Sequence, residues 1–406
     1  MFNKKTLKDI PLQGKTVLLR ADYNVPLEAD GSIADDYRLV QSLPTLQYLL
    51  EHDCTIIICS HLGRPKGQFN AQFSLQPVAT HLAALLKKEV TFLDQAIGDK
   101  VHQATLHAAH GEILLLENLR FYPGEEANDT EFARQLARDS SADYFIQDGF
   151  GVVHRAHAST AAITQFLPSV AGVLLEKEAR TLTEVMEHPK KPLTAVLGGA
   201  KVSDKITVIK RFIEVADRIV IGGAMANTFL AYRGFEIGKS VAEDDLTETL
   251  DEIYQAAAKK VGEAQVDELL ILPTDVAVAP AITNSARRTV VAVDAVAKDE
   301  LILDLGTASI ERAARAIRTA KTAVWSGTLG YAELPAFAHG SARVALEMSQ
   351  AKGITSVVGG GDTVDFVLDW DAKKGGSFSH VSTGGSASLE LLAGQKLPGI
   401  EALLDA

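Results

Sequence analysis

Short, continuously apolar runs rich in β-branched residues recur along the whole chain, and they constrain its fold more than any other feature. Apolarity that is continuous rather than alternating is typical of strands buried on both faces, as in a parallel sheet. Amphipathic patterns with helical spacing, such as Leu43, Leu46 and Leu50, lie between many of these runs. The sequence therefore predicts an α/β fold. The runs are at residues 16–19, 55–59, 113–116, 144–146, 194–197, 218–221, 269–272, 289–293, 322–325 and 355–358.

A break near the middle of the chain predicts two domains. Pro168 precedes a helical stretch from Val173 to Met186, and Pro189 and Pro192 follow it. Prolines on both sides of one helix are typical of a domain boundary. A chain of 406 residues is also long enough for two to three domains, at roughly 100–200 residues each. We expect two doubly wound α/β domains with parallel sheets, joined by a linking helix.

The composition argues against several classes of protein. Lys and Arg total 40 against 52 Asp and Glu, for a formal net charge of −12, whereas a nucleic-acid binder usually carries a basic surplus. The two cysteines, Cys54 and Cys59, are no disulfide framework. Their odd separation on a predicted strand places them on opposite faces, which argues against a shared metal site. No apolar run approaches ~18 residues and no signal peptide is evident, so we expect a soluble, cytoplasmic protein without a membrane span.

Polar residues and glycines gather where the predicted strands end, which is where ligands bind in an open parallel sheet. In the first half these residues are rich in Arg and His, which suits a small, highly charged oxyanion. In the second half they are rich in glycine, which lets a backbone approach a diphosphate closely. Lys201 and Lys205 there share a face if a helix starts at that point. The pattern predicts an anionic acceptor on one domain and a nucleotide on the other. The first set is Asp22, Asn24, 60–64, 117–120, Asp148 and 154–157; the second is 198–201, 222–223, 326–327 and 359–362.

Each of these elements also has an ordinary structural explanation. Turn initiation, helix capping, or an exposed position on a loop or helix would account for any one of them. Ligand binding is favoured by their joint location at strand ends, sorted by chemistry into two halves. The chain lacks a P-loop motif, a clean G-x-G-x-x-G after the first strand, an H-E-x-x-H zinc motif and a G-x-S-x-G nucleophile elbow. The alternative hypothesis that the chain is an NAD-dependent dehydrogenase therefore rests on fold class alone.

The motifs at these strand ends resemble those of phosphoglycerate kinases, over essentially the whole chain. The resemblance implies two Rossmann-like, doubly wound parallel-sheet domains joined by a hinge helix. It places a phosphoglycerate-binding domain at 1–170 with the C-terminal tail 380–406, the hinge helix at 171–188, and a nucleotide-binding domain at 189–379. The matching segments are LLRADYNVP at 18–26, SHLGRP at 60–65, LENLRF at 116–121, HRAHAS at 154–159, GGAKVSDK at 198–205, GGGDT at 359–363 and STGG at 382–385.

The resemblance also implies an activity and a set of site residues. These kinases move a phosphoryl group reversibly between 1,3-bisphosphoglycerate and ADP, giving 3-phosphoglycerate and ATP with Mg²⁺ as a step of glycolysis, and they are usually monomeric. The acceptor carboxylate is already ionised at neutral pH, so the chemistry needs positioning, charge stabilisation and exclusion of water by two closing domains. Residues implied for transfer are Arg38, Lys201, Gly384 and Gly385. Residues implied for phosphoglycerate are Asp22, Tyr23, Asn24, Arg38, His61, Leu62, Gly63, Arg64, Arg120 and Arg155. Residues implied for the nucleotide are Gly199, Ala200, Lys201, Lys205, Gly222, Gly223, Gly306, Glu333, Gly360, Gly361, Asp362 and Thr363, with Asp362 also at the metal.

The chain departs from the family pattern mainly near the expected nucleoside. Where these kinases usually read W-N-G-P-x-G-V-F-E, residues 325–333 read WSGTLGYAE, so Ser326 replaces Asn and Thr328 replaces Pro. Thr307 replaces the proline that usually follows Gly306, and Gln147-Asp148-Gly149-Phe150 stands for N-D-A-F. None of these changes removes a charged residue assigned above, so we expect an active kinase. The alternative is a catalytically impaired paralogue that binds phosphoglycerate in a regulatory role.

Overall fold

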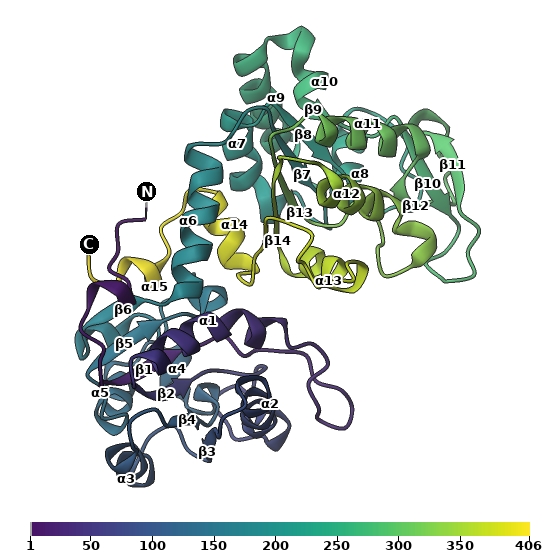
Figure 1. The fold of residues 1–406 in the computed structure, drawn as a ribbon. Helices are drawn as coiled ribbons and strands as arrows, with labels where there is room; N and C mark the ends of the chain where they lie inside the picture. Colours follow the sequence, from purple (N-terminus) through teal and green to yellow (C-terminus); the bar gives the residue numbers. More distant parts are fainter. Residues whose placement is uncertain (1) are drawn as a thin grey trace. The chain divides into compact units, whose positions relative to one another are not determined.

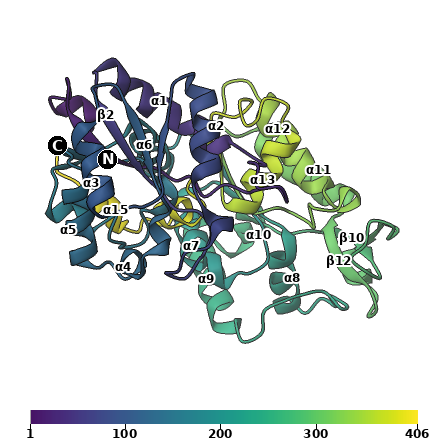
Figure 2. The same cartoon turned by 90° about the horizontal axis from the view of Figure 1, so that it is seen from below.

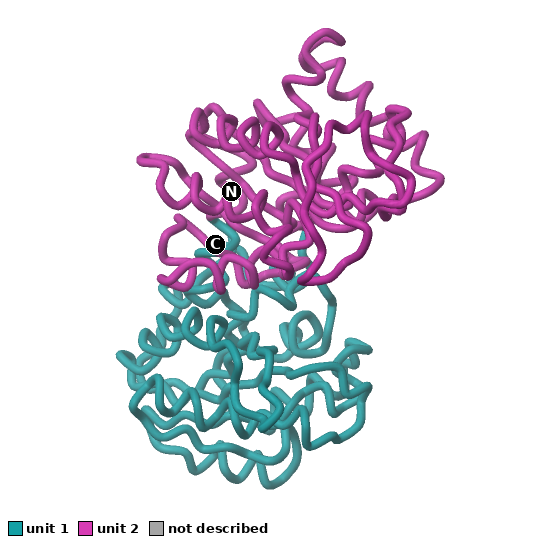
Figure 3. The backbone as a smooth tube through the Cα atoms, turned by 90° about the vertical axis from the view of Figure 1, so that its right-hand side faces the viewer, with its two compact units in different colours: residues 1–180, 396–406 teal, residues 181–395 magenta. Residues whose placement is uncertain are grey.

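The computed structural model describes residues 2–406, which form two compact units. Of the described residues, 2–180 and 396–406 form unit 1, and 181–395 form unit 2 (Figure 3). Within the described residues, no helix has the length and apolar character needed to cross a membrane.

Unit 1 is built on a six-stranded parallel sheet in the order β3-β4-β2-β1-β5-β6 (Figure 1). The non-sequential order means that helical crossovers connect the strands, as the alternating apolar runs predicted. The strands are β1 Thr16–Arg20, β2 Thr55–Cys59, β3 Thr91–Leu93, β4 Ile113–Leu116, β5 Tyr144–Gln147 and β6 Ser169–Ala171. The helices are α1 Tyr37–Glu51, α2 Gln76–Leu86, α3 Asp99–His107, α4 Pro123–Glu126, α5 Thr130–Asp139 and α15 Pro398–Glu401.

Successive residues of β1 and β2 enter two different hydrophobic cores because side chains alternate across a strand. One core joins Leu19 and Ile58 to apolar side chains of α1 and α2, and the other joins Leu18 and Ile57 to those of α3 and α5. Helices therefore cover both faces of the sheet (Figures 1 and 2). Cys54 belongs to the first core and Cys59 to the second. The prediction that the two cysteines lie on opposite faces is confirmed.

Unit 2 contains a second six-stranded parallel sheet, in the order β15-β14-β13-β7-β8-β9. Its strands are β7 Leu193–Leu197, β8 Arg218–Ile221, β9 Leu270–Ile271, β13 Thr322–Ser326, β14 Thr355–Gly359 and β15 His380–Val381. Its helices are α7 Ile206–Val215, α8 Gly223–Tyr232, α9 Thr247–Val261, α10 Val266–Leu269, α11 Thr307–Arg318, α12 His339–Gln350, α13 Gly361–Trp370 and α14 Ser386–Leu392. The two parallel sheets confirm the predicted doubly wound α/β class.

The apolar run at 289–293 was wrongly predicted to belong to a buried parallel sheet. It forms β11 (Thr289–Ala292), which pairs antiparallel with β10 (Asp275–Ala279), and β10 pairs antiparallel with β12 (Leu301–Leu305). This three-stranded sheet lies at the edge of unit 2 in both Figure 1 and Figure 2. β11 is an edge strand whose residues are largely exposed. Periodicity did not distinguish it from a buried strand because its Val residues are apolar whatever their surroundings.

The C-terminal tail divides at Lys396, not at residue 380. Residues 380–395 group with unit 2 because β15 is hydrogen-bonded in register to β14, with His380 opposite Val357. Residues 396–406 group with unit 1, where the side-chain amine of Lys4 donates to the carbonyl oxygens of Glu401 at 2.8 Å and Leu403 at 3.0 Å. The two ends of the chain are thus held together within one unit.

The linking helix is α6 (Val173–Glu187), near the predicted range of 171–188. Asp148, at the end of β5, accepts hydrogen bonds from the amides of Leu174 at 3.0 Å and Leu175 at 3.3 Å through Oδ1. These amides are in the first turn of α6 and have no partner within the helix, so Asp148 caps it. Burial raises the pKa of Asp148 to about 7. Asp148 therefore serves the helix start and not a ligand in this structure.

Candidate functional site

The carboxyl ends of four adjacent strands in unit 1, in the order β4-β2-β1-β5, carry a cluster of charged side chains. Asp22 follows β1 and is buried, and its Oδ2 lies 2.7 Å from Nη1 of Arg38 at the start of α1. Oδ1 of Asp22 accepts from the amide of Asn24 at 3.2 Å and lies 3.9 Å from Nδ1 of His61. Three residues predicted to bind phosphoglycerate, Asn24, Arg38 and His61, therefore lie close to Asp22.

The loop after β2 is held by side chains from both neighbouring strands. The amide of Gly63 donates to Oδ1 of Asn24 at 2.8 Å, and Asn118 donates through Nδ2 to the carbonyl oxygen of Leu62 at 2.7 Å. Arg120 donates through Nη1 to the carbonyl oxygen of Gly63 at 2.8 Å. Gly63 has a φ of +63°, in the left-handed region that favours glycine. The fold thus brings together the loops after β1, β2 and β4.

This cluster keeps its histidines neutral. Burial, followed by the charges of Arg20, Arg120 and Arg38, holds the pKa of His61 well below its usual range. Burial, followed by the charges of Arg20, Arg120 and Arg155, lowers the pKa of His157 to about 4. Fixed guanidinium charges beside neutral imidazoles, with Asp22 and buried Glu125 as the counter-charges, make a site suited to a multiply charged anion.

The side chains of three residues that were predicted to bind phosphoglycerate make none of the contacts described around Asp22 and Gly63. Tyr23 is fully buried, its hydroxyl lies 3.0 Å from Oγ of Ser42, and burial raises its pKa, so its side chain serves the core. Arg155 is exposed and donates through Nε to Nε2 of His154 at 3.2 Å. Arg64 is exposed on the loop after Gly63 and takes no part in the contacts described above.

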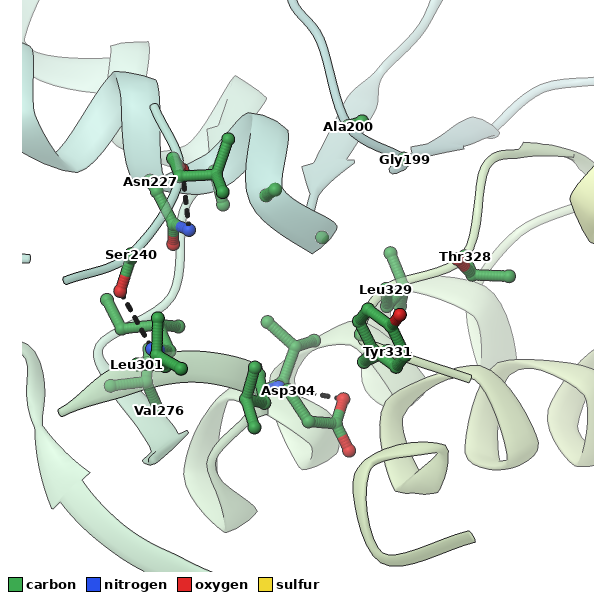
Figure 4. Close-up of a pocket in the computed structure, with 18 of the residues that line it drawn as sticks. Gly199, Ala200, Asn227, Ser240, Val276, Leu301, Asp304, Thr328, Leu329 and Tyr331 are labelled. Atoms are coloured by element: carbon green, nitrogen blue, oxygen red, sulfur yellow. Dashed lines mark hydrogen bonds between the residues drawn. The ribbon is translucent and has the colours of Figure 1, made fainter. Parts of the chain in front are cut away.

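The carboxyl ends of β8, β7, β13 and β14 in unit 2 surround a second site. A cavity of about 270 Å³ lies beside them, and Figure 4 shows part of its wall. Predicted nucleotide residues account for part of the lining, and apolar side chains of β10 and β12 account for much of the rest. The predicted residues in the wall are Gly199, Ala200, Gly223, Glu333 and Asp362. Tyr331, Val241 and Ile282 also line the cavity and are exposed.

Close packing of backbone explains two of the glycines at this site. A Cβ on Gly198 would lie 2.1 Å from the carbonyl oxygen of Thr328. Gly223 has a φ of +65°, and a Cβ there would lie 2.7 Å from the amide nitrogen and carbonyl oxygen of Gly199. Other residues would force these loops apart, so glycine lets the ends of β7, β8 and β13 meet.

The spacing of Lys201 and Lys205 would place them on one face if a helix started there. In the structure they do not share a helical face. The structure places Lys201 in an exposed loop, whereas α7 begins only at Ile206 and Lys205 is its buried N-cap residue. The amine of Lys205 donates to the carbonyl oxygens of Gly198 and Ser326, each at 2.8 Å. Burial lowers the pKa of Lys205 to about 8, against the opposing charges of Asp362 and Asp204. No helix starts at Lys201, because residues 203–205 form a separate 3-10 turn before α7.

The remaining nucleotide-site predictions fall into two groups. Asp362 is exposed in the first turn of α13, directly after Gly360 (the N-cap, with φ +90°) and Gly361.

The other group supports the wall of the cavity. Thr363 is buried, and its Oγ1 accepts a hydrogen bond from the amide of Gly327 at 2.6 Å. A Cβ on Gly222 would lie 2.6 Å from Cδ2 of Leu329, and one on Gly306 would lie 2.2 Å from Cγ of Asp275. Neither Gly222 nor Gly306 is among the residues that line the cavity.

Gly384 and Gly385 precede α14 in unit 2. The amide of Gly384 donates to Oγ of Ser382 at 3.1 Å, and Gly385 is the N-cap of α14 with a φ of +52°. Neither glycine lines the cavity described above.

Several buried polar residues in these sites were not assigned from the sequence. Arg20 and Glu125 lie beneath the arginine cluster of unit 1, and Asp304 lines the cavity of unit 2, where burial raises its pKa to about 7. The available signal was a charge within an apolar run: Arg20 ends TVLLR, and Asp304 interrupts LILDL. A buried charge needs partners, so a charge within an apolar run marks a site more sharply than one in a loop.

The fold and the two strand-end sites define a two-unit α/β protein with a charged cluster at one parallel sheet and a partly apolar cavity beside the other. Comparison with known proteins then gives the family. The family model described as phosphoglycerate kinase matches residues 7–395. The chain is 46% identical to the phosphoglycerate kinase of Moorella thermoacetica, with 99% of each covered, and 46% identical to that of Chlorobium luteolum, with 99% and 100% covered.

Solved structures agree with this assignment. Phosphoglycerate kinase from Coxiella burnetii superposes with a TM-score of 0.85 at 37% identity, with 98% of each chain covered. The enzyme from Pyrococcus horikoshii does so with a TM-score of 0.82 at 28% identity and the same coverage. The chain belongs to the phosphoglycerate kinase family, as its motifs predicted. It is a phosphotransferase of glycolysis that moves a phosphoryl group reversibly between 1,3-bisphosphoglycerate and ADP.

Proposed function

We propose that unit 1 binds the phosphoglycerate and unit 2 binds the nucleotide. The observation that carries this proposal is the cluster at the carboxyl ends of β4, β2, β1 and β5, where arginine charges surround a buried neutral His61. Such a cluster matches a small molecule with a phosphate and a carboxylate, and it offers little apolar surface for a base. The cavity of unit 2 has the opposite character, with apolar walls from β10 and β12 and glycine-rich strand ends.

In unit 1, Asp22 and Asn24 orient the hydroxyl and carboxyl end of the substrate, and Arg38 faces the group that is transferred. Arg38 is already fixed by its 2.7 Å contact with Asp22, so little side-chain freedom is lost on binding. Arg120 is likewise held by Gly63 and by Glu126, with Nε 3.3 Å from Oε1 of Glu126. His61, Arg64, Arg120 and Arg155 bind the phosphate that is not transferred. The backbone of Tyr23, Leu62 and Gly63 positions these binding side chains.

In unit 2, Glu333 meets the ribose, and Lys205 with the glycine-rich strand ends binds the nucleotide phosphates. Thr363 supports this wall through Gly327. Asp362 is exposed beside the cavity and would supply the one protein carboxylate to Mg²⁺. Among the described residues, no group of three or more His, Cys, Asp or Glu side chains is placed to hold a metal. That donor set fits Mg²⁺, which usually binds through one or two carboxylates together with waters and substrate phosphates. When bound with the nucleotide, Mg²⁺ neutralises phosphate charge.

Transfer itself is supported by cations and not by a general base. The carboxylate of 3-phosphoglycerate is ionised at neutral pH, so no proton has to be removed before it attacks the γ-phosphoryl group of ATP. Lys201 is exposed and has no contact that fixes it among those described above, whereas Lys205 is held between two carbonyl oxygens. Arg38 and the amides near Gly384 and Gly385 complete the stabilisation of its charge.

We also propose that the enzyme is a cytoplasmic monomer whose partners are its small-molecule substrates. The net charge of −12 supports the absence of a nucleic-acid partner. The arginine and lysine side chains at the two sites are local exceptions to that charge.

A pair of matched variants tests the assignment of ligands to units. Arg120→Met should weaken binding of 3-phosphoglycerate by about tenfold or more while leaving the affinity for ADP within about twofold. Lys205→Met should have the reverse effect. Isothermal titration calorimetry measures both affinities, and circular dichroism checks the fold. Equal losses of both ligands in either folded variant, or a loss of the other ligand, would contradict the assignment.

A further inference from the structure

The arginine cluster of unit 1 rests on a buried polar network centred on Arg20, the last residue of β1. Arg20 is fully buried, and all three of its guanidinium nitrogens have partners. Nε donates to Oγ of Ser159 at 2.7 Å, Nη1 donates to the carbonyl oxygen of Ala21 at 2.5 Å, and Nη2 lies 3.3 Å from Nδ1 of His61. The guanidinium is thus fixed in one orientation.

Glu125 supplies the counter-charge beneath this network. Its side chain is 1% exposed, and Oε1 lies 3.7 Å from Nη2 of Arg20. Glu125 also accepts from the hydroxyl of Ser159 at 2.6 Å and from its amide at 3.0 Å. A buried charge held by an opposite charge and by hydrogen bonds is stable in place. The network therefore presents a rigid donor, Nη2 of Arg20, to His61.

This contact decides which nitrogen of His61 carries the proton. A guanidinium has donors and no acceptor, and it stays protonated in proteins. Nδ1 of His61 can receive a hydrogen bond from Arg20 only through its lone pair, so the proton of the neutral ring lies on Nε2. Nε2 is then free to donate a hydrogen bond to a ligand.

Burial, together with the surrounding charges, keeps the ring from taking a second proton by lowering its pKa. The charges of Arg20, Arg120 and Arg38 act on it, and burial lowers the pKa of neighbouring His157 to about 4. The nearby carboxylates are already engaged: Asp22 lies 2.7 Å from Arg38, and Glu125 is held by Ser159 and Arg20. Asp22, with Oδ1 3.9 Å from Nδ1 of His61, is too far for a hydrogen bond to it.

We propose that Arg20, braced by Glu125, is a positioning residue that fixes His61 as the neutral Nε2–H tautomer, so that His61 binds the substrate phosphate as a hydrogen-bond donor and not as a cation. The binding part of this inference rests on the proposed function of unit 1, whereas the tautomer does not depend on any ligand. The phosphoglycerate site would then keep its histidine contact unchanged across the range in which an ordinary histidine titrates.

Nuclear magnetic resonance of the ligand-free protein tests the tautomer directly. In full-length protein labelled with ¹⁵N-histidine, His61→Gln identifies the His61 signals by their loss. We expect an unprotonated Nδ1 and a protonated Nε2 in the wild type at every pH from 5.5 to 8. A His61 that is protonated at Nδ1, or that becomes doubly protonated between pH 6 and 7, would overturn the proposal.

Variants separate the role of Arg20 from simple support of the fold. Arg20→Met combined with Glu125→Gln removes both buried charges together, so no unpaired charge is left behind. In this double variant we expect His61 to titrate at least about 1 pH unit higher than in the wild type, because the nearest cation is gone. Arg134→Met removes an exposed arginine on α5 and should leave the His61 signals unchanged. If the double variant does not fold, the wild-type measurement still decides the tautomer.

Binding measurements test the donor role independently. A glutamine amide can place an N–H near the position of Nε2 and carries no charge. His61→Gln should therefore keep the affinity for 3-phosphoglycerate within about threefold, while His61→Ala should weaken it by about tenfold. Equal losses in the two variants would refute the donor role. A wild type that binds no 3-phosphoglycerate but shows the expected tautomer would instead refute the proposed function of unit 1.

Discussion

The side-chain amine of Lys205 donates a 2.8 Å hydrogen bond to the backbone carbonyl oxygen of Ser326. The two residues are 121 positions apart in the sequence and meet where β13 ends beside the loop after β7. Ser326 also replaces the asparagine that is usual in this family, and its own hydroxyl lies 3.4 Å from the amine. The position that departs from the family pattern is therefore in direct contact with the buried lysine of the proposed nucleotide site.

Nucleotide affinity should fall as the pH rises through 8. Burial lowers the pKa of Lys205 to about 8 in the free protein, and phosphates placed beside the amine favour its charged form. Above pH 8 the binding of ADP must therefore include uptake of a proton. We expect ADP to bind about threefold to tenfold more weakly at pH 9 than at pH 7, measured by calorimetry with excess Mg²⁺.

The lowered pKa of Lys205 also makes the free energy of unfolding depend on pH, and this contribution rises with pH where the ADP affinity falls. Between pH 8 and 10.5 the unfolded chain binds a proton at Lys205 that the folded chain has lost. The contribution of Lys205 to the free energy of unfolding should therefore increase with pH in this window. Lys205→Met lacks this contribution, which a comparison of urea unfolding at pH 8 and pH 10 would measure. An ADP affinity that does not change between pH 7 and pH 9 would contradict the assignment of Lys205 to the phosphates.

Lys201→Ala should lower kcat by about 100-fold or more while changing the dissociation constant of ADP by less than about threefold. Lys201 is exposed, so its removal leaves no buried group without a partner. Its charge is expected to act on the phosphoryl group during transfer more than on the bound nucleotide. A coupled spectrophotometric assay and calorimetry measure the two effects. Lys210→Ala, on the surface of α7 and paired with Glu252, is the matched control and should retain full activity. An unchanged kcat in Lys201→Ala would exclude the proposed role.

Asp22→Asn should raise the KM for 3-phosphoglycerate by about tenfold without changing the KM for ATP. Asp22 fixes Arg38 through the 2.7 Å contact and the amide of Asn24 through its other oxygen. An asparagine removes the charge that holds the guanidinium in place. Asp30→Asn changes an exposed aspartate that bonds to Ser32 in the following loop, and it should leave both KM values unchanged. An effect of Asp22→Asn on ATP alone would show that Asp22 does not serve the phosphoglycerate site.

Lys4→Met should destabilise unit 1 by about 1–3 kcal/mol, because it leaves the carbonyl oxygens of Glu401 and Leu403 without their donor. The melting temperature by calorimetry checks this, with activity measured at a temperature where the variant is folded. Lys8→Met removes an exposed ion pair with Glu176 and should lower the melting temperature far less. Equal effects of the two substitutions would mean that Lys4 does not anchor the C-terminal segment.

The sequence by itself determined the α/β class, the two-part organisation and the chemistry of each strand end. Continuous apolar runs and glycine-rich turns are local properties, and a parallel sheet brings all its carboxyl ends to one edge whatever the exact strand order. Family motifs added the identities of the ligands. Strand pairing and the packing of the tail were beyond local patterns, as the antiparallel β11 and the division of the tail at Lys396 show.

Only the tertiary structure decided what each charged side chain does. Lys201 and Lys205 look equivalent in sequence, yet one is exposed and the other is buried between two carbonyl oxygens. In the sequence Arg20 is only the last residue of an apolar run, yet in the structure it fixes the ring of His61. These differences arise from burial and from partners more than 40 residues away along the chain, such as His61 for Arg20 and Ser326 for Lys205. Desolvation and hydrogen bonding act through space, so a pKa or a tautomer is set only when the chain has folded.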